Sequence, residues 1–261
     1  MSRTCKRVLL IDADVLAYEA CSAVQQEIEF EPGYYTWQSK FEDVEDAFDT
    51  QLNKIKEALD GDEVKLCLTD SEGNFRKSIL LTYKGKRGKK PLVLKAFKQH
   101  LIDNRGAVFR PGLEGDDCMG ILATMPHKGE ERIIVSIDKD MKQIPGKWVR
   151  WPDQKEITIT EAEANYFHIV QTLTGDVTDG YSGCPGIGPV KAEKILDPFV
   201  VHDVYPSFDV AAAWPAIVKL YEAKGMTEDD ALVQARVARI LRASDYDFKR
   251  KEPILWTPQR S

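Results

Sequence analysis

The chain has 261 residues, of which 43% are hydrophobic and 30% are charged, and its formal net charge is −6. This composition is typical of a globular protein with a substantial core, which excludes a disordered chain and a small scaffold held by disulfides or zinc. The first apolar run, Val8 to Ile11, is too short for a signal peptide or a membrane span, so we expect a cytoplasmic protein without membrane contact.

Apolar runs and helical spacings alternate along the first part of the chain. Buried strands are predicted at 8–11, 64–68, 107–109 and 132–137. Helices are predicted at 40–60, from Pro91 as a first helical position, and at 116–125. Residues 27–38 indicate a hairpin or loop insertion, to which we assign no function. The alternation is typical of a parallel α/β sheet, in which ligands bind beyond the carboxyl ends of the strands.

The segment after about residue 160 is predicted to be helical. Thr160 and Glu163 form a capping box at the start of one helix, and two further helices are predicted at 208–223 and 227–243. The last of these would carry Arg236, Arg239 and Arg242 along one stripe. A solvated helix face is favoured over a DNA contact for this stripe.

Carboxylates recur where strands end or helices begin. These residues are Asp12, Asp70, Glu114, Asp116, Asp117, Asp138, Asp140, Asp176 and Asp179. If the strands are neighbours, the side chains converge, and each like-charged pair at about 6 Å costs roughly 3 kcal/mol at an effective dielectric of about 20. Hard divalent cations, Mg²⁺ or Mn²⁺, relieve that repulsion, and two such ions suit phosphodiester hydrolysis. Taken singly, each carboxylate also fits a helix cap or a turn residue.

Basic residues concentrate in the stretch between Glu72 and Asp103, which contains no acidic residue. Within it, Lys84 and Arg87 are candidates to neutralise a phosphate, while Arg76 and Tyr83 are candidates for DNA contacts, with Tyr83 stacking on an unpaired base. The alternative is a mobile, solvated basic loop.

A glycine-rich turn precedes a short helix at residues 181–196. Gly186 and Gly188 force a tight turn, and Lys191 lies at the start of the helix. Backbone amides there can hold a phosphate of duplex DNA, or the carbonyls of the turn a monovalent cation. An ordinary helix-turn-helix core contact is the alternative.

Taken together, these motifs resemble the flap endonuclease and 5′-to-3′ exonuclease family, which includes stand-alone bacteriophage enzymes. The resemblance covers about residues 7–197. It rests on LIDAD at Asp12, LTYKGKR at 81–87, LEGDD at 113–117, SIDKD at 136–140 and TGDVTDGYSGCPGIG at 174–188.

The resemblance implies a PIN-like α/β nuclease core over residues 1–163, with a basic helical arch at about 73–104. It also implies a helical DNA-binding region over 164–261, containing a helix–three-turn–helix motif at about 176–197. By position, the first metal group is Asp12, Asp70, Glu114 and Asp116. The second is Asp138, Asp140, Asp176 and Asp179, with Asp117 between the two groups as an outer-shell or shared ligand. Lys84 matches the family lysine that contacts the scissile phosphate, and Arg87 matches its basic neighbour.

The implied activity is Mg²⁺-dependent removal of nucleotides from DNA 5′ ends and cleavage of 5′ flaps, together with degradation of RNA in RNA–DNA hybrids such as primers. We expect a monomer with two Mg²⁺ or Mn²⁺ ions, and the motif leaves room for K⁺ at the helix–three-turn–helix. Two departures matter: Val190 replaces the usual lysine, with Lys191 following it, and the arch is compact. The alternatives are a non-catalytic module that binds branched DNA and a PIN-type ribonuclease.

Overall fold

A computed structural model describes residues 5–85, 88–201 and 207–260. Its centre is a six-stranded sheet in the order β5-β4-β1-β6-β7-β8, in which only β8 is antiparallel to its neighbour. The strands are β1 (Lys6–Asp12), β4 (Glu63–Leu68), β5 (Val108–Phe109), β6 (Glu130–Val135), β7 (Gly146–Arg150) and β8 (Lys155–Ile159). The predicted strands and the parallel α/β class are confirmed.

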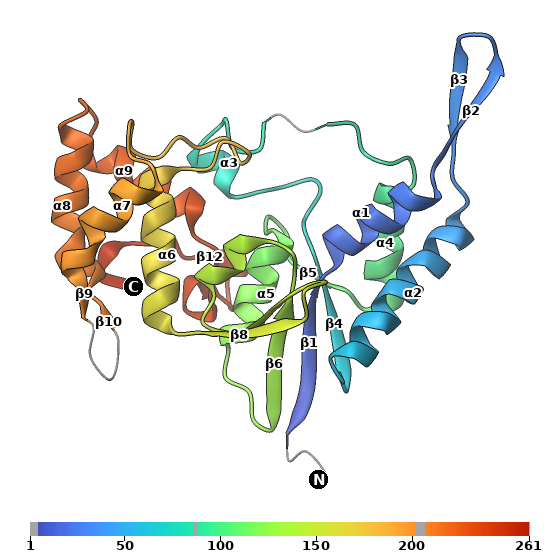
Figure 1. Cartoon of the computed structure of the whole chain (residues 1–261), viewed down its shortest axis with the longest axis horizontal. Helices are drawn as coiled ribbons and strands as arrows, with labels where there is room; N and C mark the ends of the chain where they lie inside the picture. Colours follow the sequence, from blue (N-terminus) through green and yellow to red (C-terminus); the bar gives the residue numbers. More distant parts are fainter. Residues whose placement is uncertain (1–4, 86–87, 202–206, 261) are drawn as a thin grey trace.

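Both faces of the sheet are covered, which is why β1 is a continuous apolar run. Leu9 and Ile11 pack on one face beneath α1 (Ala13–Val24), α2 (Phe41–Ala58) and α4 (Leu94–Arg105). Val8 and Leu10 pack on the other face with α5 (Gly115–Thr124). Figure 1 shows the two layers of helices on either side of the sheet.

The register aligns the carboxyl ends of the central strands. Ile11 of β1 lies opposite Leu66 of β4 and Val135 of β6. The residues that follow these strands therefore emerge at one edge of the sheet, as the alternation of strands and helices predicted.

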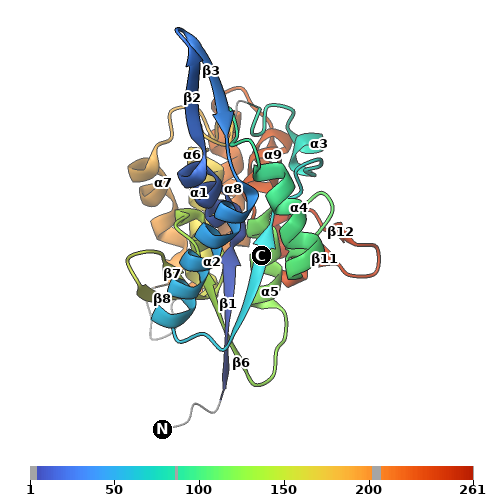
Figure 2. The same cartoon turned by 90° about the vertical axis from the view of Figure 1, so that its right-hand side faces the viewer.

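The insertion after α1 is a hairpin of β2 (Gln26–Glu31) and β3 (Tyr34–Gln38), so the prediction for residues 27–38 is confirmed. Figure 2 shows it projecting away from the rest of the molecule. Every residue of both strands is exposed.

The expected helical arch is largely irregular. It begins with the single-turn helix α3 (Arg76–Ile79), and the described residues between α3 and α4 contain no further helix. Helix α4 begins at Leu94, so Pro91 is not its first residue. Gly85, Gly88 and Pro91 disfavour a helix there, and so does the mutual repulsion of nearby lysines.

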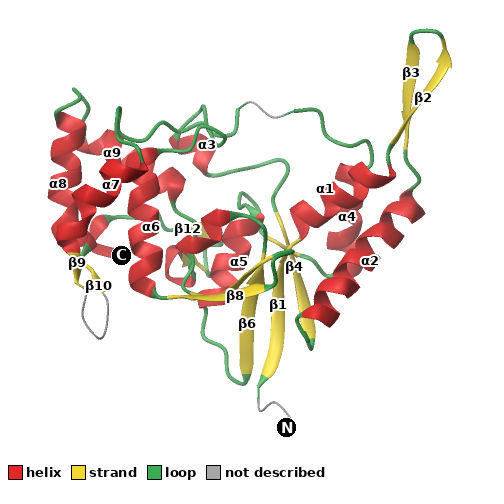
Figure 3. Ribbon diagram, viewed as in Figure 1, coloured by secondary structure: helices red, strands yellow, loops and turns green. Residues whose placement is uncertain are grey.

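Helices dominate the chain from residue 161 onward, as Figure 3 shows. They are α6 (Glu161–Thr174), α7 (Pro189–Leu196), α8 (Val210–Glu222) and α9 (Glu228–Ala238). The short strand pairs are β9 (Val200–Val201) with β10 (Ser207–Phe208) and β11 (Tyr246–Asp247) with β12 (Glu252–Pro253). These helices enclose their own apolar cluster around Ile169, Ile217 and Tyr221. Among the described residues, no helix combines the length and apolarity that crossing a bilayer requires.

The end of α9 differs from its prediction. The helix stops at Ala238, and the chain then returns to the sheet, where Ile240 and Leu241 join the cluster of Val8 and Leu10. The predicted arginine stripe is therefore wrong as a solvated face and as a DNA contact, because two of its three arginines are buried. Arg239 pairs with Asp245, and Arg242 donates to the Gln143 carbonyl oxygen at 2.9 Å.

Candidate active site

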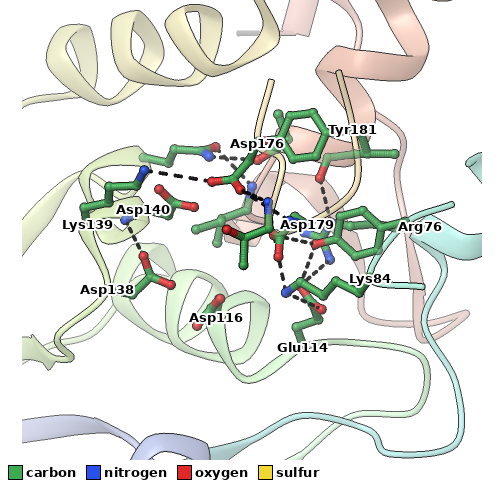
Figure 4. A pocket seen from close by; sticks show the side chains of 16 residues that line it. Arg76, Lys84, Glu114, Asp116, Asp138, Lys139, Asp140, Asp176, Asp179 and Tyr181 are labelled. Atoms are coloured by element: carbon green, nitrogen blue, oxygen red, sulfur yellow. Dashed lines mark hydrogen bonds and ion pairs between the residues drawn. The ribbon is translucent and has the colours of Figure 1, made fainter. Parts of the chain in front are cut away.

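A polar pocket of about 250 Å³ lies at the carboxyl edge of the sheet. The carboxylates that line it are Glu114, Asp116, Asp138, Asp140, Asp176 and Asp179. They come from the start of α5, from the turn after β6 and from the loop after α6, and Figure 4 shows them facing one another with Lys84. Segments far apart in sequence thus meet at one place, as expected.

Lys84 joins the arch to the carboxylates. Its Nζ lies 2.8 Å from Glu114 Oε1 and 3.5 Å from Asp179 Oδ2. Burial disfavours its charge, but Glu114 and Asp179 outweigh this and raise the pKa of Lys84 above its usual value. Burial likewise opposes ionisation of Glu114, yet Arg76 and Lys84 hold the pKa of Glu114 below its ordinary value. This pair therefore remains an ion pair at neutral pH.

Ser136 connects the ends of β1 and β6. Its hydroxyl donates to Asp12 Oδ2 at 2.9 Å and accepts the backbone N–H of Asp138 at 3.1 Å. Asp138 Oδ1 in turn accepts the N–H of Asp140 at 2.8 Å, beginning the 3₁₀ turn Lys139–Gln143. Asp12 is buried behind the pocket and is not part of its lining.

The turn after α6 brings Asp176 and Asp179 to the opposite wall. Asp176 Oδ1 accepts the N–H of Thr178 at 2.7 Å, and the Lys84 N–H donates to the Asp179 carbonyl at 2.8 Å. Gly180 sits against the arch: a Cβ there would lie 2.5 Å from the Thr82 carbonyl oxygen, and its φ is +77°. Only glycine permits this approach without a shift of backbone.

Several carboxyl groups in and behind the pocket are harder to ionise than free carboxyl groups. Burial and Asp14 raise the pKa of Asp12 to about 7, and burial and Asp138 raise that of Asp140 to about 7. Burial also raises the pKa of Asp116 and Asp179. A bound divalent cation would favour the ionised forms, and all-oxygen donors suit a hard ion. In the described part of the chain, no three carboxylate, thiol or imidazole groups already stand in a chelating arrangement.

Burial contradicts the DNA contacts predicted for Arg76 and Tyr83, and it excludes Asp117 as a direct metal ligand while leaving the outer-shell role open to it. Asp117 is fully buried, and its oxygens accept from Arg76 at 2.7 and 2.8 Å and from the backbone N–H of Glu114 and Leu241 at 3.1 and 3.0 Å. It has no lone pair left for a metal ion. Arg76 is 1% exposed and cannot contact DNA, and Tyr83 is 2% exposed and cannot stack on a base. The Tyr83 hydroxyl donates to Glu114 Oε2 at 3.0 Å instead.

Asp70 lies in the loop after β4 and outside the pocket lining. Its carboxylate accepts the N–H of Gly112 at 2.7 Å and that of Glu72 at 2.9 Å. Asp14 lies nearby, and its carboxylate pairs with Lys98 Nζ at 2.6 Å. It stands with Asp12 in the LIDAD motif, but it was not predicted as a site residue from the sequence.

The glycine-rich turn is exposed at the start of α7. Gly186, Gly188 and Lys191 all face solvent, and Lys191 Nζ donates to the Gly186 carbonyl at 3.0 Å. Arg87 lies outside the described residues.

Several polar residues that support the carboxylates were missed by sequence reasoning. Asn74 donates to Glu114 Oε1 at 2.9 Å, and Gln171 donates to Asp140 Oδ1 at 2.8 Å. Ser136 could have been suspected from its place in SIDKD, but Asn74 and Gln171 stand outside any recognisable charge pattern.

The architecture is similar to that of two solved structures. The structure of a T5 5′-exonuclease variant covers 89% of this chain and 87% of its own, with a TM-score of 0.60 and 13% identity. A bacteriophage T5 flap endonuclease in a complex with DNA and metal ions gives a TM-score of 0.59 at 14% identity, covering 89% of each chain. The parallel sheet and its covering helices thus share the fold of these two structures.

Sequence comparison agrees with the fold. The family model of the 5′-3′ exonuclease N-terminal resolvase-like domain matches residues 7–168. The exodeoxyribonuclease of Enterobacteria phage T3 is 32% identical, and the exonuclease of Escherichia phage T7 is 31% identical; each alignment covers 97% of this chain and 94% of the relative. The chain belongs to the 5′-3′ exonuclease family and is a nuclease.

Proposed function

We propose that this nuclease hydrolyses DNA from 5′ ends and at 5′ flaps with two divalent cations, Mg²⁺ or Mn²⁺. The observation that carries the proposal is the meeting of carboxylates from α5, the β6 turn and the α6 turn around one pocket, with Lys84 between them. The T5 relative whose structure contains DNA and metal ions supports the same reading.

We assign the pocket residues to the two metal groups that the family resemblance implies. Glu114 and Asp116, with Asp12 and Asp70 at the same sheet edge, would hold the first ion. Asp138, Asp140, Asp176 and Asp179 would hold the second. Ions held there would supply Lewis acidity to activate the attacking water and stabilise the departing 3′ oxygen. Lys84 positions the scissile phosphate and offsets its charge, as Arg87 would beside it.

The DNA duplex would lie along the exposed turn before α7. Gly186, Gly188 and Lys191 present backbone groups and one ammonium there, which suits contact with phosphates rather than bases, and K⁺ at the turn carbonyls would suit the same role. The same surface would also accept RNA paired with DNA. The nuclease would then serve in primer removal during replication or in degradation of host DNA. We expect residues 1–163 to carry the chemistry and 164–261 the duplex contacts, in a monomer.

Substitution of a pocket carboxylate tests the proposal. Asp138→Asn should reduce cleavage of a labelled 5′-flap DNA by at least about 100-fold with Mg²⁺ present, while leaving flap binding in the presence of EDTA within about twofold. Asp153→Asn is the matched control, because Asp153 is exposed and, among the residues that the structure describes, forms an ion pair only with Arg150. Full activity of Asp138→Asn, or cleavage by the wild type in EDTA, would contradict two-metal hydrolysis.

Substrate comparison tests the class of reaction. The wild type should cleave 5′-flap DNA, recessed 5′ ends and the RNA of a hybrid, and it should leave single-stranded RNA largely intact. A preference for single-stranded RNA would favour the PIN-type ribonuclease instead.

A further inference from the structure

The five residues 237–241, which we call the strap, end α9 and pass directly beneath the pocket, where Val237, Ala238 and Ile240 line it. Each strap residue gives a backbone group to a side chain that supports the acidic site. Arg76 donates to the Val237 and Arg239 carbonyls, and the Leu241 N–H donates to Asp117 at 3.0 Å. The Gln143 side chain forms hydrogen bonds with the two remaining strap residues, Ala238 and Ile240.

The orientation of the Gln143 amide is determined by the strap. The Ile240 N–H can only donate, so the atom that it meets at 3.2 Å must be the Gln143 oxygen. The Ala238 carbonyl can only accept, so the atom that it meets at 2.7 Å must be the Gln143 nitrogen.

The orientation of the Gln143 amide also determines that of the Gln171 amide. The Gln143 nitrogen also meets the Gln171 side chain, so Gln171 must present its oxygen to Gln143. Its own nitrogen then faces Asp140 Oδ1 at 2.8 Å. Gln143 and Gln171 are 1% and 5% exposed, so water does not compete effectively for these bonds.

We propose that Gln171 is a positioning residue that orients Asp140, and that Gln143 holds Gln171 in register with the strap. The inference rests on the proposed function, since it assigns Asp140 to the second metal group. It makes the C-terminal segment a working part of the acidic site. Partners that orient a metal ligand typically change metal affinity by about 10- to 100-fold when they are removed.

The test uses Gln171→Met, Gln143→Met and the double variant. Gln99→Met is the matched control, because Gln99 also donates to an aspartate Oδ1, that of Asp103 at 2.9 Å, but on the exposed face of α4. Mn²⁺ binding is measured by calorimetry without DNA. Cleavage of 5′-flap DNA at saturating Mn²⁺ gives kcat and KM.

We expect each single variant to weaken Mn²⁺ binding at one site by about 10- to 100-fold, and kcat to fall while KM for DNA stays within about twofold. Both residues act on Asp140 through one chain of hydrogen bonds. The Mn²⁺ affinity of the double variant should therefore lie within about twofold of the lower of the two single-variant affinities. Gln99→Met should match the wild type.

Two results would overturn the inference: Mn²⁺ binding by the folded variants equal to that of the wild type, or losses that multiply in the double variant. Circular dichroism checks folding. If Gln171→Met does not fold, Gln171→Asn replaces it with the same expectation, since its amide is one methylene too short to join Gln143 and Asp140. A wild type that neither binds Mn²⁺ nor cleaves DNA would refute the proposed function itself, before any variant is measured.

Discussion

Arg76 and Asp117 form a buried ion pair beneath the pocket, and removing one partner alone should be costly. Arg76→Met leaves the fully buried Asp117 charge without its two-bond partner, so the free energy of unfolding should fall by about 3–5 kcal/mol. Urea denaturation measures the change. Arg105→Met, which breaks a half-exposed pair with Asp49, should cost less than about 1 kcal/mol.

The double variant Arg76→Met/Asp117→Asn separates charge from packing. The amide introduced by the second substitution carries no charge, so no unpaired charge stays buried and part of the loss should be recovered. If the double variant loses as much free energy of unfolding as the two single variants lose together, the pair acts through packing alone.

His168 should make stability depend on pH. Burial, with the nearby Arg239 and Arg242 charges, holds the pKa of His168 well below its usual value, so the ring is neutral in the folded state. The unfolded chain binds a proton near pH 6.5, and stability is therefore lost as the pH falls below that value. Between about pH 7.5 and about pH 5.5 this group should remove about 1.4 kcal/mol.

The comparison that isolates this effect is His168→Gln, which can still donate to the Ala235 carbonyl that His168 Nε2 meets at 2.8 Å. Urea denaturation of both proteins in EDTA at the two pH values gives the difference in slope. Equal slopes would mean that the pKa of His168 is the same in the folded and the unfolded protein.

At the scale of single residues, the sequence predicts that the pocket carboxylates converge, but it does not predict that their neighbours Arg76 and Tyr83 are buried. Asp116, Asp138 and Asp140 follow strands or open helices, and that position alone predicts the sheet edge. The burial of Arg76 depends instead on carbonyls of residues 237 and 239, which no local pattern reveals.

The β2–β3 hairpin should be dispensable for stability. None of its strand residues is buried, and its aromatic rings include Phe30 and Tyr34, each 62% exposed. Replacing residues 26–38 by a short Gly-Ser linker should change the free energy of unfolding by less than about 1 kcal/mol, the scale of the lost Lys89–Trp37 contact. By contrast, Phe48→Ala in α2 should cost about 3–5 kcal/mol, since Phe48 is fully buried. A loss above about 2 kcal/mol on hairpin removal would refute this.

Elements with a strong period were predictable, and elements shaped by distant contacts were not. The apolar spacing of α2 and the run of β1 each specify one structure, and both were found. The early end of α9 was not foreseeable, because the Leu241 backbone packs so closely on α5 that a Cβ on Gly120 would lie 2.3 Å from the Leu241 carbonyl oxygen. This close packing on α5 involves residues that a longer α9 would have included.

At the scale of the whole molecule, the C-terminal helices have their own apolar cluster, yet they are tied to the sheet by the strap. Ile240 and Leu241 pack with Val8 and Leu10, while strap backbone groups satisfy Arg76, Gln143 and Asp117, which are all buried. Opening the C-terminal part alone would remove the strap partners of these polar groups, at about 1–3 kcal/mol for each buried group left unsatisfied. Partial opening should therefore be rare.

The chain should consequently unfold in one transition. Far-ultraviolet circular dichroism and tryptophan fluorescence, to which Trp214 and Trp256 of the C-terminal cluster contribute, should report the same urea midpoint. Amide exchange in α9 should require nearly the same opening free energy as in β1. In Arg76→Met the strap loses two of its bonds, so exchange in α9 should accelerate more than exchange in β1. Separate wild-type transitions, with α9 opening well before β1, would show that the strap does not couple the two parts.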